Sequence, residues 1–405
     1  MKSRKASTQD DLRRHNRARL LRRLHESGAA TRSELVAFTG LNRSTVGVLV
    51  SELAVTGLVS EVPGSAGQVG RPSLVVQPTP EAAVVTAFDV RVDRTVVALV
   101  GIGGEELWRL EQVHERATFT PEWAVRNVVG LIREALLHAP PEAAWVGVGI
   151  AVPGIVDHID SVVRLAPNIG WEDVPLGALI TGAINDEFGF CPPVRIGNDA
   201  DLGALSEHVR GVGTHHRNLV FLSGEVGIGG GVIIDGRALL GAGGFGGEFG
   251  HMVVNPDGKL CRCGAHGCWE TEIGRDAIVA GAGLDPENHD VSDVVTAAAH
   301  GDIRAAEAIH QAGEWLGIGI ANVVNILNPE VIVLGGHLRL LLPMVGGTVH
   351  RRLEFAMPAL RDQVRVEVPA LGGDSSLLGA AEAAFEDLLD DPLAVLENAV
   401  HATAS

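Results

Sequence analysis

The sequence predicts an α/β protein in which a small N-terminal winged helix-turn-helix precedes a larger, two-lobed α/β body. Three observations lead to this prediction. The chain has 405 residues, which is too long for one ordinary core and favours two or three domains. Residues 1–76 contain 12 Lys and Arg against 6 Asp and Glu, whereas the remainder contains 20 against 44. From Pro80 onward, predicted strands and helices alternate, which is typical of sheets covered by helices.

The basic segment contains three predicted helices. Residues 10–27 place leucines at helical spacing among arginines, which indicates an amphipathic helix. Thr31 and Glu34 have the spacing of a capping box and open a short second helix. Asn42 caps a third helix, whose apolar residues recur at positions i, i+3, i+4 and i+7.

The second and third helices are joined by a glycine-containing turn, and polar residues occupy the exposed first turn of the third helix. This arrangement suits the major groove of DNA. The segments "LVSEV" and "LVVQP" then form the strands of a wing, and an arginine in the loop between them can enter a minor groove. We therefore expect residues 1–76 to bind DNA, with Arg43, Ser44, Thr45 and Arg71 as the contacting residues.

The body begins with a predicted hairpin, "AVVTAFDV" and "RTVVALVGI", followed by a helix around "PEWAVRNVVGLIREALL" and a buried strand "AWVGVGIAV". Further strands are "NLVFLSG", "GVIIDG" and "EVIVLGG", and "EAIHQAGEWLGIGIANVVNIL" is a long helix. We expect a first lobe at 80–199 and a second lobe at 200–374. A C-terminal helix at 375–390 is expected to pack back on the first lobe. The acidic tail from Asp387 onward is expected to be a solvated helix and then a frayed end.

A cluster of metal-binding residue types lies in the second lobe. Cys261, Cys263 and Cys268 follow His251, and three thiolates with one imidazole suit a closed tetrahedral Zn²⁺ site. His266 is an alternative fourth ligand. Because it lies between Cys263 and Cys268, the short segments joining it to them leave little room for all three to bind the same ion. Because a closed site leaves no position for water, the predicted zinc is structural and does not support hydrolysis.

Cysteine usage and hydropathy also indicate the compartment. Four cysteines in a chain of this length form no disulfide framework, and their clustering indicates a reducing, cytoplasmic setting. Cys191 is expected to fill apolar space. No apolar run is long enough for a membrane span, and the basic N-terminus lacks the apolar stretch of a signal peptide.

Taken together, these motifs resemble the ROK family (repressors, open reading frames and kinases), specifically its sugar-responsive repressors with an N-terminal winged helix. The resemblance covers nearly the whole chain. It is carried by "VPGIVD", "APNIGWEDVPL", "GNDAD", "GEVGIGGG", "GGFGGEFGH", "CRCGAHGCWE" and "NPEVIVLGG". It implies a body with the two-lobed actin/hexokinase-like (ribonuclease H-like) fold, and it selects His251 as the fourth zinc ligand.

A sugar site is predicted beside the zinc cluster. The cluster draws Glu248, His251 and Glu270 together, and such groups hydrogen-bond vicinal hydroxyls. The motif "GND" follows a strand, so Asn198 and Asp199 lie at its carboxyl end, where α/β sheets bind ligands. In the family's kinases the residue at Asp199 is the general base. By resemblance, the family's sugar contacts correspond to Asn168, Asn198, Asp199, Glu248, His251 and Glu270.

The phosphate-binding turns of the family's kinases are altered in this chain. Their Asp-x-Gly-Gly-Thr turn reads Asp-Val-Arg-Val-Asp at 89–93. Without the two glycines, side chains prevent a phosphate from approaching the backbone closely. The carboxylate in place of the threonine hydroxyl repels a phosphate. A second turn, usually Gly-Thr-Gly, reads Glu-Val-Gly at 225–227. We therefore predict that the protein has no catalytic residues and is not an enzyme.

The predicted function is a cytoplasmic, DNA-binding transcription regulator, most simply a repressor, that responds to a sugar or phosphosugar. A single helix-turn-helix per chain and the family resemblance together imply a palindromic operator and a homodimer or homotetramer. Two alternatives stay open. One is an ATP-dependent sugar kinase with atypical phosphate-binding turns. The other is a regulator whose body binds a protein partner instead of a sugar.

Overall fold

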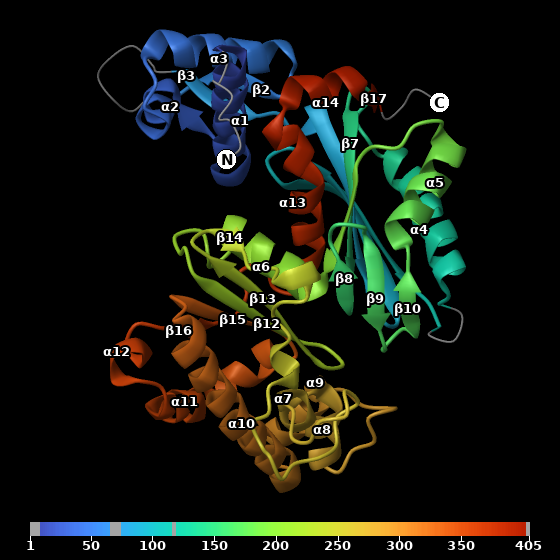
Figure 1. The fold of residues 1–405 in the computed structure, drawn as a ribbon, viewed down its shortest axis with the longest axis vertical. Coiled ribbons are helices and arrows are strands. Elements are labelled where there is room, and N and C mark those ends of the chain that lie inside the picture. Colours follow the sequence, from blue (N-terminus) through green and yellow to red (C-terminus); the bar gives the residue numbers. More distant parts are fainter. Residues whose placement is uncertain (1–8, 65–73, 116–118, 402–405) are drawn as a thin grey trace, which may run out of the picture.

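The computed structural model describes residues 9–64, 74–115 and 119–401. The predicted α/β class is confirmed: helices and strands alternate along the body, and a small helical unit with its own sheet precedes it. Figure 1 shows this unit, here called the head, at the upper end of the molecule, with the two sheets of the body below it. Within the described residues, no helix combines the length and apolar character needed to cross a membrane.

The head contains the three predicted helices and a three-stranded antiparallel sheet in the order β1-β3-β2. Both predicted caps are confirmed: Thr31 and Glu34 bond each other's backbone N–H, and Asn42 Oδ1 accepts from Thr45 N at 2.8 Å. These caps fix where α2 and α3 begin. The elements are α1 (Gln9–Ser27), β1 (Ala30–Thr31), α2 (Arg32–Thr39), α3 (Arg43–Val55), β2 (Val59–Pro63) and β3 (Leu74–Pro78).

The first sheet of the body has the order β11-β7-β4-β5-β6. Successive residues of a strand point to opposite faces, so Val84 and Phe88 join the core under α4 and α5, whereas Val85 and Ala87 join the core under α13. The sheet is therefore buried on both faces. Its elements are β4 (Ala83–Val90), β5 (Arg94–Gly101), β6 (Glu105–Val113), α4 (Pro121–Leu136), β7 (Ala144–Val152), α5 (Leu176–Phe188) and β11 (Val194–Asn198). A small sheet of β8 (Ile155–Asp157), β9 (Val162–Ala166) and β10 (Trp171–Val174) extends from it.

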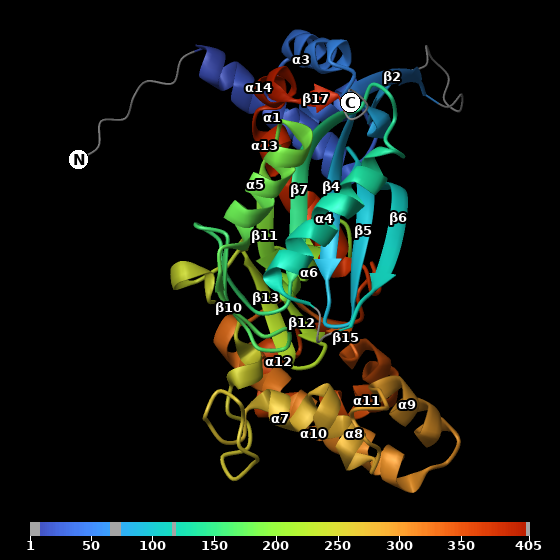
Figure 2. The same ribbon diagram turned by 90° about the vertical axis from the view of Figure 1, so that its right-hand side faces the viewer.

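The second sheet has the order β14-β13-β12-β15-β16. Helix α6 covers one face, and α10 and α11 cover the other. Figure 2 shows the shorter helices α7, α8 and α9 beside α10 at the lower end. The elements are α6 (Asp199–Val209), β12 (Leu219–Gly224), β13 (Ile228–Ile234), β14 (Arg237–Ala238), α7 (Trp269–Ile273), α8 (Arg275–Gly281), α9 (Val291–Ala299), α10 (Ile303–Leu327), β15 (Val331–Gly336), α11 (Leu338–Arg352), α12 (Pro358–Arg361) and β16 (Arg365–Glu367).

The C-terminal segment differs from the expected solvated tail, which is wrong for the part of it that the structure describes. Helix α13 (Ser375–Asp390) contains Asp387, whose carboxylate accepts from Arg195 Nη2 at 2.7 Å. Leu388 and Leu389 are buried. The chain continues as α14 (Pro392–Asn398), and β17 (Val400–His401) pairs with β7. The acidic residues therefore face arginines that are remote in sequence.

Helix α13 packs directly on the backbone of β7. A Cβ atom at Gly147 would lie 2.3 Å from the carbonyl oxygen of Ala384, and one at Gly149 would lie 1.9 Å from that of Ala380. Only glycine permits this approach. Figure 1 shows α13 running from the junction of the two body sheets up to the head.

Candidate functional site

The structure brings the four predicted zinc ligands together. One ligand atom from each of His251, Cys261, Cys263 and Cys268 lies within 4.8 Å of all the others. Nδ1 of His251 is 3.7 Å from Sγ of Cys261, and the Sγ atoms of Cys263 and Cys268 are 3.5 Å apart. A zinc tetrahedron with Zn–S bonds of about 2.3 Å has edges of about 3.8 Å. The dimensions of this cluster, here called the clip, therefore fit one tetrahedral Zn²⁺.

Backbone turns shape the clip. A Cβ atom at Gly267, where φ is 70°, would lie 1.5 Å from the carbonyl oxygen of Asn255. Trp269 is fully buried, and its Nε1–H donates to the carbonyl oxygen of Trp315 on α10 at 3.0 Å. The clip is thus anchored to the second lobe. His266 instead places Nδ1 3.2 Å from the carbonyl oxygen of Gly258 and lies outside the ligand cluster.

Two predicted sugar-binding carboxylates lie next to the clip. Glu270 Oε1 accepts from the Cys261 thiol at 2.9 Å and lies 3.7 Å from His251 Nδ1. On the other side of the ring, His251 Nε2 is 4.0 Å from Glu248 Oε2. The imidazole therefore faces the thiols with one nitrogen and a carboxylate with the other. Partial burial raises the pKa of Glu248, and repulsion from Asp201 and Glu270 adds to it.

The glycine run of β13 brings Asp199 to the same place. A Cβ atom at Gly227 would lie 2.6 Å from Glu270 Oε2, and one at Gly229 would lie 4.0 Å from Asp199 Oδ1. The two carboxylates therefore lie beside positions two residues apart at the start of β13. Burial raises the pKa of Asp199 to about 7, and the negative charges of Glu225 and Asp89 add to the shift.

The two predicted asparagines make contacts within the protein. Asn198 caps α6: its Oδ1 accepts from Ala200 N at 2.8 Å, and its Nδ2 donates to the carbonyl oxygen of Gly154 at 2.8 Å. Asn168, in the first lobe, accepts a hydrogen bond from Arg262 Nη1 at 3.4 Å. Because Arg262 lies between two clip cysteines, this contact joins the clip to the first lobe.

Sequence reasoning missed three side chains in this region: Arg262, His158 and Asp201. His158 Nε2, from the turn after β8, lies 3.7 Å from Asp201 Oδ2 on α6. Burial raises the pKa of Asp201, and His158 opposes that shift. Asp201 and Arg262 were visible inside the motifs "GNDAD" and "CRCGAHGCWE", whereas no local pattern singles out His158.

The altered phosphate turn is filled by an ion pair. Arg91 Nε donates to Asp89 Oδ2 at 2.8 Å, and Arg91 Nη2 donates to the carbonyl oxygen of Gly373 at 2.8 Å. Asp89 is only 2% exposed. Across the second turn, a Cβ atom at Gly336 would lie 3.0 Å from Glu225 Oε1. Arg91 and Glu225, which stand at glycine positions of the expected phosphate-binding turns, thus place side chains of opposite charge in this region.

Three of the four candidate DNA-binding residues lie on α3. Arg43 and Ser44 are exposed at the start of α3. Ser44 Oγ donates to Asn42 Oδ1 at 2.7 Å, and Thr45 is half-buried. Arg43 forms no ion pair within the described residues. Arg71 lies outside the described residues.

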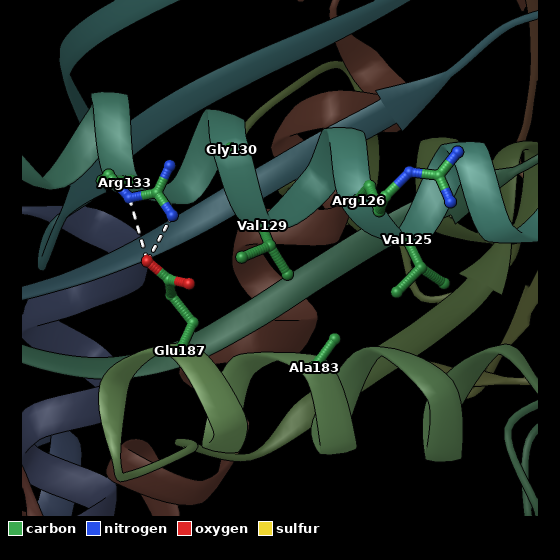
Figure 3. Close-up of a pocket in the computed structure, with 7 residues that line it drawn as sticks. All are labelled: Val125, Arg126, Val129, Gly130, Arg133, Ala183 and Glu187. Carbon is green, nitrogen blue, oxygen red and sulfur yellow. Dashed lines mark hydrogen bonds and ion pairs between the residues drawn. The ribbon is translucent and has the colours of Figure 1, made fainter.

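A separate hollow lies between α4 and α5 (Figure 3), on the face of the first sheet opposite α13. It has a volume of about 240 Å³, and an ion pair between Arg133 and Glu187 spans it at one end. None of its lining residues is a candidate sugar, metal or DNA ligand. They are Val125, Arg126, Val129, Gly130, Arg133, Ala183 and Glu187.

Comparisons with known proteins agree with this arrangement. Residues 85–386 match the sequence profile of the ROK family. The chain is 30% identical over 377 residues to a xylose repressor of Bacillus spizizenii, covering 93% of this chain and 96% of the relative. A glucokinase of Halalkalibacterium halodurans is 32% identical over 263 residues, which cover 60% of this chain and 77% of that enzyme.

Among solved structures, the chain resembles a ROK family transcriptional regulator, a homolog of the E. coli MLC protein. The TM-score is 0.78 at 25% identity, and the match covers 96% of this chain and 98% of that one. The similarity therefore includes the head, whereas the glucokinase similarity leaves two fifths of this chain unmatched. The predicted fold of the body is confirmed by these matches, and the chain belongs to the ROK family.

Proposed function

We propose that this protein is a DNA-binding transcriptional repressor whose body binds a sugar and does not phosphorylate it. The observation that carries the proposal is the contrast within the body. Glu248, His251 and Glu270 converge beside the clip, whereas the Arg91–Asp89 pair fills the turn where a kinase would hold phosphates. Since phosphoryl transfer depends on positioning and charge neutralisation of the nucleotide, this arrangement supports recognition without transfer.

The proposed effector is an uncharged sugar. Four carboxyl groups lie in the region around the clip, those of Asp199, Asp201, Glu248 and Glu270. Burial raises the pKa of both Asp199 and Glu248, and repulsion from neighbouring carboxylates, among them Asp201, adds to each shift. Carboxylates accept hydrogen bonds from sugar hydroxyls and repel a phosphate or a second carboxylate. D-xylose is the first sugar to test, because the similar full-length relative is a xylose repressor.

In this proposal a structural Zn²⁺ occupies the clip. Bound by three thiolates and Nδ1 of His251, the ion would hold the imidazole so that Nε2 faces Glu248 and the sugar. With all four ligands supplied by the protein, the ion would neutralise thiolate charge next to Glu270 and would not activate a water. Its contribution is therefore the shape and orientation of the pocket wall.

The proposed DNA contacts are Arg43, Ser44 and Thr45 on α3 and Arg71 in the wing. Purified protein should capture genomic fragments that share a palindromic sequence, and D-xylose should elute them.

Arg43→Ala should weaken binding to the captured operator by roughly 10-fold to 100-fold, the size of one good base contact, with a smaller loss on random DNA. Arg365→Ala, on the exposed strand β16, is the control. Equal losses on both DNAs would reduce Arg43 to a phosphate contact, and capture without any shared sequence would contradict the repressor proposal.

A sugar kinase is the second candidate, because Asp199 occupies the general-base position of the family's kinases and has a pKa of about 7. A coupled assay with ATP, Mg²⁺ and a panel of aldoses separates the two functions. We expect no turnover above background. A rate of about 1 per second or more, within the usual enzyme range, would establish the kinase.

A further inference from the structure

The head and the body share one hydrophobic core. Leu20, Leu21 and Leu24 of α1 are fully buried in the same cluster as Phe385 and Leu388 of α13. Figure 1 shows α1 beside the upper part of α13. The head is therefore packed against the body through this core and is not connected to it by a flexible linker alone.

A buried polar network lies at this contact. His25 is fully buried at the end of α1, and its Nδ1 accepts from Gly103 N at 2.9 Å. The ring proton then lies on Nε2, which is 3.0 Å from Oε2 of Glu382 on α13. Glu382 is 5% exposed. Both nitrogens of the imidazole are thus engaged, one by the body's β5–β6 turn and one by α13.

Arg210, the residue that ends α6, completes the network. Its Nε donates to Glu382 Oε1, and its Nη1 donates to the carbonyl oxygen of Gly103 at 2.8 Å. Nη1 also lies 3.2 Å from the carbonyl oxygen of His25. Glu382 therefore bonds both the imidazole of the head and the guanidinium at the end of α6.

The opposite end of α13 contacts the candidate sugar site. Ser376 Oγ donates to the carbonyl oxygen of Asp199 at 2.9 Å, and Ser206 Oγ of α6 donates to the carbonyl oxygen of Ser375 at 2.6 Å. The two helices touch closely, since a Cβ atom at Gly379 would lie 1.9 Å from the carbonyl oxygen of Leu202. Six residues of helix, or about 9 Å along its axis, separate Ser376 from Glu382.

We propose that α13 transmits effector occupancy from Asp199 to the DNA-binding head, and that Glu382 is the positioning residue at the head end. This inference rests on the proposed function. A sugar that shifts the first turn of α6 shifts the backbone to which Ser376 is bonded, and α13 passes that displacement to His25. Effector and operator then influence each other through a single packed element with contacts to both sites.

Burial distinguishes Glu382 from the other head contacts of α13. Glu386 and Asp390 both bond Arg22 at 2.9 Å, but their side chains are 51% and 70% exposed. Exposed pairs contribute little because water screens them, whereas removal of one charge from a buried network leaves its partners unpaired. Glu386, one turn further along the same helix, is therefore the matched control.

The test is the reciprocal coupling of sugar and operator. For wild type, Glu382→Gln and Glu386→Gln, operator affinity is measured by fluorescence anisotropy with and without saturating sugar. The sugars are D-xylose, D-glucose and N-acetyl-D-glucosamine. The sugar that changes the operator Kd of the wild-type protein most is used for all variants. We expect the wild-type operator Kd to change about 5-fold to 150-fold, the usual range of coupling. Glu382→Gln should reduce that change to less than about 2-fold, and Glu386→Gln should keep it.

Sugar binding to the DNA-free variants, measured by calorimetry, should match wild type, which shows that the site itself is intact. Ser376→Ala provides a second variant at the other end of α13, should Glu382→Gln fail to fold, and it should also lower the coupling. Full coupling in Glu382→Gln, or in Ser376→Ala if only that variant folds, overturns the inference. Absence of sugar binding or operator binding in wild type instead defeats the proposed function, so the two failures are distinguishable.

Discussion

The two halves of the body's ligand region have different side chains on the same scaffold. On the sugar side, Glu270 and His251 keep positions fixed by the clip and by glycines that leave room for a carboxylate. On the phosphate side, Arg91 and Asp89 bond each other across the turn. One side exposes hydrogen-bonding groups to a ligand, and the other satisfies its own charges internally. In the proposed function, this difference accounts for sugar binding without phosphoryl transfer.

Among the substitutions that test this comparison, one that disrupts the clip should have the largest effect on sugar affinity. Cys263→Ser removes one thiolate, and the remaining ligands no longer close a tetrahedral site. We expect loss of zinc and a fall in sugar affinity of at least about 100-fold, since ligand orientation depends on the ion. Metal analysis and calorimetry measure both. Cys191→Ser, at a half-buried thiol outside the clip, should change neither, and a zinc-free variant that still binds sugar would separate the clip from the pocket.

The second prediction concerns the phosphate side. Arg91→Ala leaves Asp89 buried without its partner, so we expect a loss of about 3–5 kcal/mol in the free energy of unfolding, with sugar affinity unchanged. Arg94→Ala, whose ion pairs are at least 3.6 Å long and exposed, should cost less than about 1 kcal/mol. Denaturant titrations of both variants test this. If the two variants are equally stable, the Arg91–Asp89 pair does not hold the turn together.

The third prediction compares two glutamates on one short helix. Glu270→Gln removes the charge beside the clip and should weaken sugar binding about 10-fold to 100-fold, the range for a hydrogen bond to a charged group. Glu272, two residues on, instead accepts from Asn255 Nδ2 at 2.8 Å. Glu272→Gln should leave sugar affinity within about 2-fold. The reverse result would move the sugar site away from the clip.

The smallest expected effect is the pH dependence of stability at Asp199. Its pKa in the folded protein, about 7, lies above the ordinary value of 3.8, so the folded state holds the proton more tightly. The associated stability is fully present below pH 4 and is lost as the pH rises through 7. The melting temperature of Asp199→Asn should therefore rise relative to that of wild type as the pH increases from 5 to 8. Asp157→Asn should show no such trend in this range, because the hydrogen bond from Arg164 lowers the pKa of Asp157 and the associated stability is lost only as the pH falls below about 4.

Sequence reasoning succeeded where the determinants are local. The caps at Thr31 and Asn42 each involve residues three apart, and the four clip ligands fall within a short stretch. It failed where partners are remote. The acidic tail was expected to be a solvated helix, yet Asp387 pairs with Arg195. His25 and Glu382 are 357 positions apart, and no local pattern joins them.

The charge of the head shows the same limit. Its excess of arginines is compatible with DNA binding, but several of these arginines face carboxylates within the protein. Arg13 and Arg17 bond Glu52, and Arg22 bonds Glu386. The basic composition therefore serves attachment of the head to an acidic body as well as the proposed contact with phosphates, and total charge overstates the number of side chains free for DNA.

The core shared by α1 and α13 has a consequence for building chimeric regulators. A graft that joins this head to another sugar-binding body at residue 76 would keep α1 but lose Phe385 and Glu382, which belong to the far end of the chain. The natural unit of exchange is the head together with the C-terminal helix, and a biosensor assembled from these parts has to transplant both.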